Sequence, residues 1–388
     1  MTTATSSCPS DSTPEATSPG GAWSARRIEL ADVRRWRRVE FGFSDGVTVL
    51  VGPNGAGKTT VIEALTFACL GVSPRTRSEG EMLRHGAEAL WVGLEIEGPA
   101  GVETRSIGYA PRRGRRLQRD GVAVRGLGDW RRRGAVLVFL PDELRSVKGP
   151  PAARRRSLDR LLEAAEPGYA DDLTGYQRAV AQRNALLRRV RAGQASPDGL
   201  APWEAQMVAL GASVARARRA AARALEPLFR TWMDRLGGGP DATLRVESSP
   251  SELAQAPDAE IGEALAAAWD ARRDRDHAAA QTTAGPHRDD VWIGRGDHDL
   301  RRLGSQGEQR LAALALLLGH RDHLSDRGPT PIMLLDDVLS ELDPSRRDAL
   351  LEAVGDGGQT IVTTADPAAA ASAAERGAHV VEVGQDGA

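Results

Sequence analysis

The feature that most constrains the fold of this chain is the run GPNGAGKTT, from Gly52 to Thr60. It fits the pattern G-x-x-x-x-G-K-[ST], with Gly52, Gly57, Lys58 and Thr59 in register. The apolar run VTVLVG precedes it and a helical pattern over about 58–70 follows, which is the strand–loop–helix context that this motif requires. The run therefore predicts an α/β fold in which a glycine loop encloses phosphate.

The residue types in this loop suit a nucleotide and its metal. Glycines let backbone N–H groups turn inward around phosphate oxygens, and the positive end of the following helix adds to the attraction. We expect Lys58 to bridge the β- and γ-phosphates of ATP, and the Thr59 hydroxyl to bind Mg²⁺. The other residues of the loop are candidate phosphate contacts too: Gly52, Pro53, Asn54, Gly55, Ala56, Gly57 and Thr60.

A second strand that ends in acid is the natural complement of such a loop. PIMLLDDV, residues 331–338, has four apolar residues typical of a buried parallel strand, followed by Asp336 and Asp337. Ligands bind at the carboxyl ends of strands in α/β sheets. We therefore expect Asp336 to hold Mg²⁺, and Asp337 to position or polarise the attacking water.

A third stretch, RRLGSQGEQRLAALALLLGH at 301–320, is a polar glycine turn that runs into an apolar helix. Taken alone, it is a helix start whose apolar side packs in a core. A serine hydroxyl in front of a helix N-terminus is also suited to a phosphate. Its candidate contacts are Ser305, Gln306, Gly307 and Gln309, with Ser305 also counted as catalytic.

The 388 residues suffice for one large or two ordinary domains. The composition and periodicity of the sequence change twice along the chain. Residues 1–22 are rich in Ser, Thr, Pro and Gly and are predicted to be a disordered tail. Helical periodicity from 151 to 281 predicts a helical insertion. It separates an N-terminal half of an ATPase head, 23–150, from a C-terminal half, 282–388.

Composition narrows the class of protein further. The longest apolar runs, such as 311–319, are too short to cross a bilayer, which takes about 20 residues. The chain has no secretory start, and Cys8 and Cys69 are its only cysteines, so we expect a cytoplasmic protein without a disulfide framework.

Charge is concentrated in one part of the chain. Residues 105–160 hold sixteen Arg or Lys against five Asp or Glu, a net charge of +11 in a chain whose net charge is −2. A basic face of this kind fits DNA phosphates, while a solvated face in an arginine-biased chain is the alternative. The candidate DNA-binding residues are Arg112, Arg113, Arg115, Arg116, Arg131, Arg132 and Arg133.

The order of these motifs resembles that of ABC-type ATPases, and longer blocks resemble the RecF family of recombination mediators in the SMC-like branch. These blocks lie at 139–162, 176–187, 285–291, 305–318 and 334–347. The resemblance implies an ABC-type P-loop ATPase head, split by the insertion, that acts in recombinational DNA repair and replication-fork maintenance. Arg34 aligns with a family stretch and joins the candidate cofactor-binding residues.

In this family two heads bind ATP head to tail, so the resemblance implies an ATP-dependent homodimer. The turn at Ser305 would act across the interface on the nucleotide held by the other subunit, and residues 340–343 would lie at the same interface. The resemblance implies hydrolysis that DNA stimulates, and two departures from the ABC pattern imply that it is slow. Asp337 stands where transporters have glutamate, and TTAD lacks a histidine, so that Thr363 or Thr364 stands in its place.

Partners implied by the resemblance are duplex or gapped DNA, without sequence specificity, and RecO- and RecR-like mediators. Two other functions stay open: a nucleotide-gated DNA scaffold with negligible hydrolysis, and the nucleotide-binding subunit of an ABC transporter. In GPHRDD at 285–290 we expect Arg288 to pair with Asp289 or Asp290, and His287 to be structural.

Overall fold

The computed structural model describes residues 21–131, 135–355 and 357–384. Most of the predicted disordered tail, 1–20, lies outside these residues, as do Arg132 and Arg133. Gly21 and Ala22, which we assigned to the tail, pair with the main fold. Ala22 forms a β-bridge with Thr330, and the Thr330 N–H donates to the Gly21 carbonyl at 3.1 Å.

Among the described residues, five parallel strands drawn from both ends of the sequence form the central sheet. Their spatial order is β14-β3-β13-β12-β8. They are β3 (Val47–Val51), β8 (Val136–Phe139), β12 (Ile332–Leu335), β13 (Thr360–Thr364) and β14 (His379–Glu382). Because β3 and β8 come from the first part of the chain and the others from the last, the two parts share one sheet.

Both faces of this sheet are buried, as expected for parallel strands. On β12, Ile332 and Leu334 belong to one core and Met333 and Leu335 to another, because successive side chains point to opposite faces. Helix α1 (Lys58–Leu70) lies in the first core, and α10 (Gln306–Ser325) in the second. Both helices start close to their predicted positions. Cys69 of α1 is buried and free.

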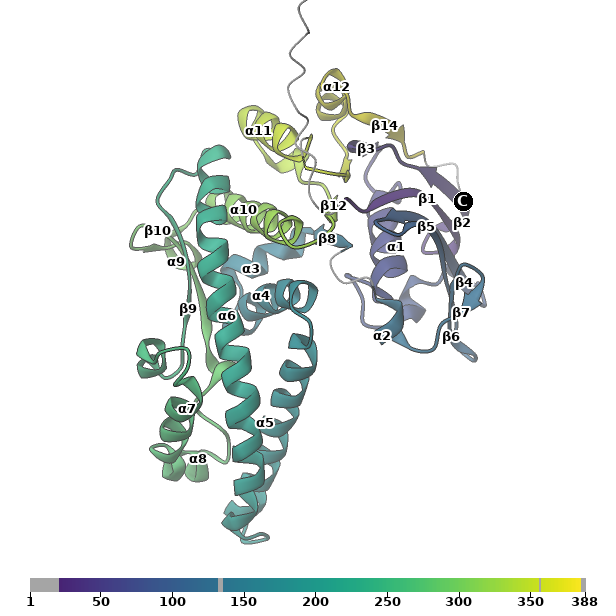
Figure 1. Ribbon diagram of the computed structural model, residues 1–388. Coiled ribbons are helices and arrows are strands. Elements are labelled where there is room, and N and C mark those ends of the chain that lie inside the picture. The colour runs from purple at the N-terminus through teal and green to yellow at the C-terminus, as the bar shows by residue number, and fades with distance from the viewer. Residues whose placement is uncertain (1–20, 132–134, 356, 385–388) are drawn as a thin grey trace, which may run out of the picture.

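A largely antiparallel sheet lies on the far side of α1 (Figure 1). Within the part of the chain that the structure describes, its strand order is β2-β1-β4-β5-β6-β7. The strands are β1 (Ser24–Val33), β2 (Trp36–Gly42), β4 (Leu90–Gly98), β5 (Gly101–Ala110), β6 (Gly114–Arg119) and β7 (Val122–Ala123), followed by the short helix α2 (Leu127–Trp130). Apolar side chains of β1 and β4 alternate toward α1 and complete the first core.

The inserted region forms an elongated lobe beside the head (Figure 1). Its long helices α5 (Tyr169–Arg191) and α6 (Ala201–Arg235) pack against each other, and α6 also packs on α10. The other α-helices of this region are α4 (Pro151–Ala165), α7 (Ile261–Asp270) and α8 (Arg273–Ala279), and the short α3 (Arg145–Lys148) comes just before it.

The inserted region is not purely helical, which differs from our prediction. Strand β9 (Ala242–Glu247) lies within it and pairs with β10 (Asp290–Arg295), which in turn pairs with β11 (His298–Asp299). Residues 290–295, assigned above to the C-terminal half of the head, therefore extend this lobe instead of joining the central sheet. Residues 242–247 alternate apolar and polar side chains, which is the period of a half-buried strand, and our helical assignment of 151–281 overlooked this signal.

The last part of the chain returns to the head. It contains α9 (Leu300–Leu303), α11 (Pro344–Gly355) and α12 (Pro367–Glu375), besides α10 and β12–β14. Within residues 21–131, 135–355 and 357–384, no helix is both long and apolar enough to cross a membrane.

Candidate nucleotide-binding site

Three neighbouring strands bring the predicted nucleotide motifs together. Strands β3, β13 and β12 are adjacent and parallel, so their carboxyl ends meet at one edge of the sheet. The glycine loop follows β3, Asp336 follows β12, and Thr363 and Thr364 end β13. A cavity of about 400 Å³ lies at this edge and is lined by Arg34, Arg35, Asn54, Gly55, Gly57, Lys58, Thr59, Thr60, Arg75, Asp336, Asp337 and Thr363.

Two glycines of the loop cannot be replaced without moving their neighbours. Gly57 has φ of 103°, and a Cβ there would lie 2.6 Å from Nε1 of Trp36. A Cβ on Gly52 would lie 2.4 Å from the carbonyl oxygen of Val383. The loop thus passes so close to the surrounding structure at these two positions that backbone alone fits. Two of its N–H groups are used within the fold: Gly52 donates to the Thr364 carbonyl at 3.3 Å and Ala56 to the Pro53 carbonyl at 3.1 Å.

The Lys58 ammonium is held inside the loop. Its Nζ donates to the carbonyl oxygens of Gly52 at 2.7 Å and Pro53 at 3.0 Å. Burial lowers the pKa of Lys58, and the charges of Asp337 and Asp336 act in the opposite direction. A compact ammonium on loop carbonyls beside two acids is a cation placed for phosphate oxygens.

The predicted metal-binding pair is assembled. Thr59 donates its hydroxyl to the Asp336 carboxylate, with Oγ1 at 2.9 Å from Oδ1 and 3.0 Å from Oδ2. Burial raises the pKa of Asp336, and hydrogen bonds from Thr363 and Thr59 oppose this shift. A hydroxyl and a carboxylate are the hard oxygen donors that Mg²⁺ prefers when phosphates complete its shell. The residues present therefore fit Mg²⁺.

Asp337 has a left-handed backbone, with φ of 53°. Its N–H donates to Thr363 Oγ1 at 2.9 Å, and its carboxylate accepts a hydrogen bond from the Ser340 hydroxyl. Because a non-glycine residue in this conformation is strained, these contacts help to hold it there. We named Thr363 only as a residue in place of histidine; its contact with both acids was not visible in the sequence.

Arg34 lines the cavity, but its guanidinium is engaged elsewhere. Nε and Nη2 donate to the two carboxylate oxygens of Glu63 at 3.0 and 2.8 Å, and Nη1 donates to the Glu81 carbonyl at 2.6 Å. The hydrogen bonds to Glu63 raise the pKa of Arg34. Glu63 is buried in α1 and also accepts from Ser73 and Arg75. Sequence reasoning missed this acid, which gave no motif signal.

The turn before α10 lies apart from this cavity. Ser305 is the N-cap: its hydroxyl accepts from the Glu308 N–H at 3.2 Å, and Glu308 accepts from the Ser305 N–H at 2.9 Å. Ser305, Gln306 and Gly307 are exposed. None of the predicted contacts in this turn lines the cavity that contains Lys58.

Gln309 differs from its neighbours in the turn. It is buried, and its Nε2 donates to the carbonyl oxygens of Leu300 at 2.9 Å, Arg301 at 3.3 Å and Gly304 at 3.2 Å. In this structure the amide therefore faces the turn, not solvent, and it holds the backbone that presents Ser305. Sequence spacing could not distinguish this inward position from an outward one.

The GPHRDD stretch connects parts of the inserted lobe that are distant in sequence. Its ion-pair partners differ from those we expected. Asp290 pairs with Arg154, not with Arg288, whose Nε donates to the Thr282 carbonyl at 3.4 Å. His287 is structural: Nδ1 lies 2.8 Å from the Tyr176 hydroxyl and Nε2 lies 3.1 Å from the Thr282 carbonyl oxygen.

The basic segment is less available than its charge suggests. Arg115 is paired with Glu79, Arg131 donates from Nε to the Leu70 carbonyl at 3.3 Å, and Arg105 is buried beside Trp130. Three arginines of the β5–β6 turn and the strand that follows it are exposed and, among the residues that the structure describes, have no ion-pair partner: Arg112 and Arg113 in the turn, and Arg116 in β6.

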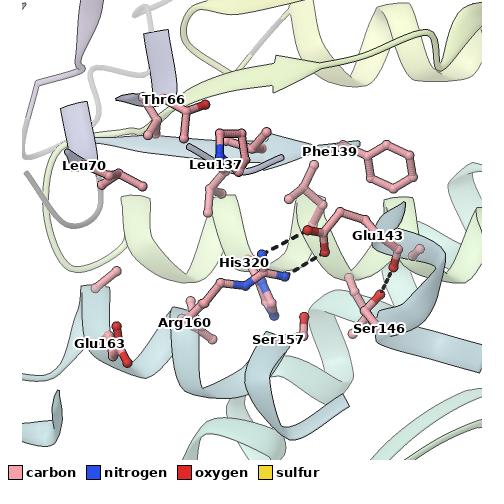
Figure 2. A pocket seen from close by; sticks show the side chains of 18 of the residues that line it. Thr66, Leu70, Leu137, Phe139, Glu143, Ser146, Ser157, Arg160, Glu163 and His320 are labelled. Atoms are coloured by element: carbon pink, nitrogen blue, oxygen red, sulfur yellow. Dashed lines mark hydrogen bonds and ion pairs between the residues drawn. The ribbon is translucent and has the colours of Figure 1, made fainter. Parts of the chain in front are cut away.

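A second cavity, of about 340 Å³, lies away from the glycine loop and is lined mainly by α1, β8, α4 and α10. Figure 2 shows Arg160 joined to Glu143 in this cavity, at 2.9 and 2.7 Å, with His320 nearby. Its lining is largely apolar and contains none of the phosphate-loop glycines. We therefore assign the nucleotide to the first cavity.

A phosphate loop after β3, an acid at the end of β12 and a polar turn opening α10 define the head of an ABC-type P-loop ATPase, interrupted by a helical lobe. Comparison with known proteins agrees with this class. A family model described as an AAA domain matches residues 27–107. The head of Smc bound to the C-winged helix domain of ScpA has a TM-score of 0.56 at 15% identity, covering 89% of this chain and 91% of that chain.

Similar sequences and a similar solved structure show to which family of P-loop ATPases the chain belongs. The DNA replication and repair protein RecF of Synechococcus sp. is 33% identical, over 93% of this chain and 96% of its own length. The corresponding protein of Acidothermus cellulolyticus is 35% identical, over 87% and 93%. A solved structure of the recombination mediator RecF with ATP has a TM-score of 0.79 at 24% identity, covering 89% of this chain and 93% of that chain. The chain belongs to the RecF family of DNA replication and repair proteins.

Proposed function

We propose that this protein is an ATP-dependent DNA-binding clamp of recombinational repair and replication-fork maintenance. ATP binding joins two heads in a head-to-tail homodimer on DNA, and slow hydrolysis releases it. The observation that carries the proposal is that the turn at Ser305 is preformed and exposed, yet it lies outside the cavity that contains Lys58. A second subunit would bring such a turn to the nucleotide.

Within one head, each loop residue has a separate task. Loop N–H groups and Lys58 hold the phosphates, while Thr59 and Asp336 hold Mg²⁺. A Mg²⁺ ion held by Thr59 and Asp336 would supply positive charge beside the phosphates. Asp337 positions the attacking water.

Slow hydrolysis follows from the same residues, and stimulation by DNA is what the family resemblance suggests. The carboxylate of Asp337 is one methylene shorter than glutamate and accepts a hydrogen bond from Ser340. No histidine ends β13, where Thr363 and Thr364 stand. The Ser340 contact also favours a second candidate, a nucleotide-gated DNA scaffold with negligible hydrolysis.

For DNA we propose backbone contacts from the β5–β6 turn and β6, where Arg112, Arg113 and Arg116 are exposed. Guanidinium groups bind phosphate with two hydrogen bonds and without sequence preference. We propose that the DNA is duplex or gapped and that the protein acts in the cytoplasm. Mediators like RecO and RecR are the protein partners that the family suggests.

The proposal is tested by measuring dimerisation in an analytical ultracentrifuge with and without Mg²⁺ and ATP. Ser305→Arg should keep monomeric ATP binding and lose the ATP-driven dimer, because the guanidinium would occupy the phosphate position across the interface. Lys58→Met should lose both. Gln194→Arg, at an exposed site on the inserted lobe, is the matched control.

If Ser305→Arg still forms the ATP-driven dimer, the proposal is wrong and Ser305 is only the N-cap of α10. Single-turnover hydrolysis with and without duplex DNA separates the clamp from the scaffold, because only the clamp hydrolyses ATP within its DNA-bound lifetime.

A further inference from the structure

The Thr363 hydroxyl is the one group that contacts both acids at the end of β12, among the residues that the structure describes. It donates to Asp336 Oδ1 at 2.7 Å and accepts the Asp337 N–H at 2.9 Å. Thr363 is fully buried at the carboxyl end of β13. A hydroxyl has one hydrogen to donate, and Thr363 donates it to the acid expected to hold the metal.

The two hydrogen bonds of Thr363 restrain different parts of the site. The bond to Asp336 restrains the carboxylate, which also accepts from Thr59, so that Asp336 lies between hydroxyls from two different elements. The bond from the Asp337 N–H restrains the backbone, whose φ of 53° is unfavourable for an aspartate. One side chain therefore sets the direction of the first acid and the conformation of the second.

We propose that Thr363 is a positioning residue that presets both acids for Mg²⁺ and water before nucleotide arrives. It rests on the proposed ATPase function. Thr363 acts through Asp336 and Asp337, so it is not a catalytic residue. Partners that orient metal ligands in this way typically change metal affinity about 10- to 100-fold when removed.

The same strand supplies a matched control. Thr360 is also a buried threonine of β13, but its hydroxyl has no hydrogen-bond partner among the described residues. Valine replaces threonine at either site with nearly the same shape and without the hydroxyl. Serine keeps the hydroxyl and loses only the methyl group. Comparing the three variants separates the hydrogen bonds from packing.

The experiment measures binding of a fluorescent ATP analogue to the full chain in EDTA and over a Mg²⁺ titration, together with ATP turnover and thermal melting. For Thr363→Val we expect the half-saturating Mg²⁺ concentration to rise about 10-fold or more, with binding in EDTA within about twofold of wild type. The turnover number should fall while KM for ATP in saturating Mg²⁺ changes little. Thr363→Ser and Thr360→Val should both resemble wild type.

Two results would overturn the proposal. One is an unchanged Mg²⁺ dependence in Thr363→Val. The other is that Thr363→Val and Thr360→Val shift the Mg²⁺ dependence and lower the melting temperature equally. That result would mean that both substitutions act only by disturbing the packing of β13. Failure of the wild-type chain to bind the analogue under any condition would count against the ATPase function itself, and so is distinguishable from both.

Discussion

Arg154 on α4 forms a two-point ion pair with Asp290, the first residue of β10, across 136 positions of sequence. The Arg154 side chain is only 3% exposed. Arg155 donates to the neighbouring Asp289 carbonyl. These contacts join the start of the inserted lobe to the strand that closes it, close to the chain's return into the head. The GPHRDD stretch is therefore part of the framework of this lobe.

Breaking this pair should destabilise the protein strongly. Arg154→Met leaves Asp290 without its main partner. Because the Asp290 side chain is 24% exposed, we expect a cost of about 2 kcal/mol, typical of a lost hydrogen bond to a charged group and below that of a fully buried pair. Arg223→Met removes an exposed pair with Asp258 and should cost about 1 kcal/mol or less. Urea unfolding followed by tryptophan fluorescence measures both. Similar destabilisation in the two variants would show that the Arg154 pair adds nothing beyond a surface contact.

The loop glycines should differ in their tolerance of a methyl group. Gly57→Ala places a Cβ against Trp36 in a backbone whose φ is 103°. We expect the affinity for ATP to fall at least about 10-fold, because a loss of about 1.4 kcal/mol of binding free energy is enough for a tenfold change. At Gly55 φ is 80° but nothing lies within 4 Å of the added Cβ, so only backbone strain remains. Calorimetric titration with ATP compares the two. An equal fall in affinity would mean that the contact with Trp36 is unimportant.

Salt dependence should show whether the β5–β6 turn meets DNA. Replacing Arg112, Arg113 and Arg116 by alanine should lower the slope of log affinity against log salt by about 0.9 for each phosphate that the protein no longer neutralises. The control removes the same charge from exposed α5 positions, with Arg178, Arg188 and Arg189 replaced by alanine. Fluorescence anisotropy of labelled duplex DNA with ATP measures the slope. Equal slopes in both triple variants would exclude a special role for the turn.

One buried histidine, His320, and one half-buried histidine, His287, should make the fold sensitive to acid. Burial lowers the pKa of His287 to about 4 and that of His320 to about 3. Both values lie below the ordinary 6.5, so the unfolded chain takes up protons first as the pH falls. Stability should therefore decrease from about pH 6.5 downward until the folded pKa values are reached.

Replacing His320 by leucine tests this directly. The variant should lose less stability than wild type between about pH 6.5 and pH 4, by a few kcal/mol, since each unit of pKa corresponds to about 1.4 kcal/mol. Urea midpoints measured across this pH range give the comparison. Parallel pH profiles for the two proteins would contradict a buried neutral imidazole at this position.

The phosphate loop, the acid-ended strand and the helix after Ser305 were predictable because each is a local pattern of spacing and residue type. The α/β class followed, because such a loop needs a strand before it and a helix after it. Strand β9 escaped prediction although residues 242–247 alternate apolar and polar, because the helical periodicity of the neighbouring segments was extended over the whole insertion.

The sequence by itself thus predicted which residues are suited to phosphate and metal chemistry: Lys58, Thr59 and Asp336. The tertiary structure alone decided which distant side chains contact one another, in the predicted site and elsewhere in the fold. Thr363 reaches Asp336 across 27 positions and Arg154 reaches Asp290 across 136, while Gln309 turns inward beside the exposed Ser305. Such partners are set by strand register and helix packing, which bring together residues that no local pattern connects.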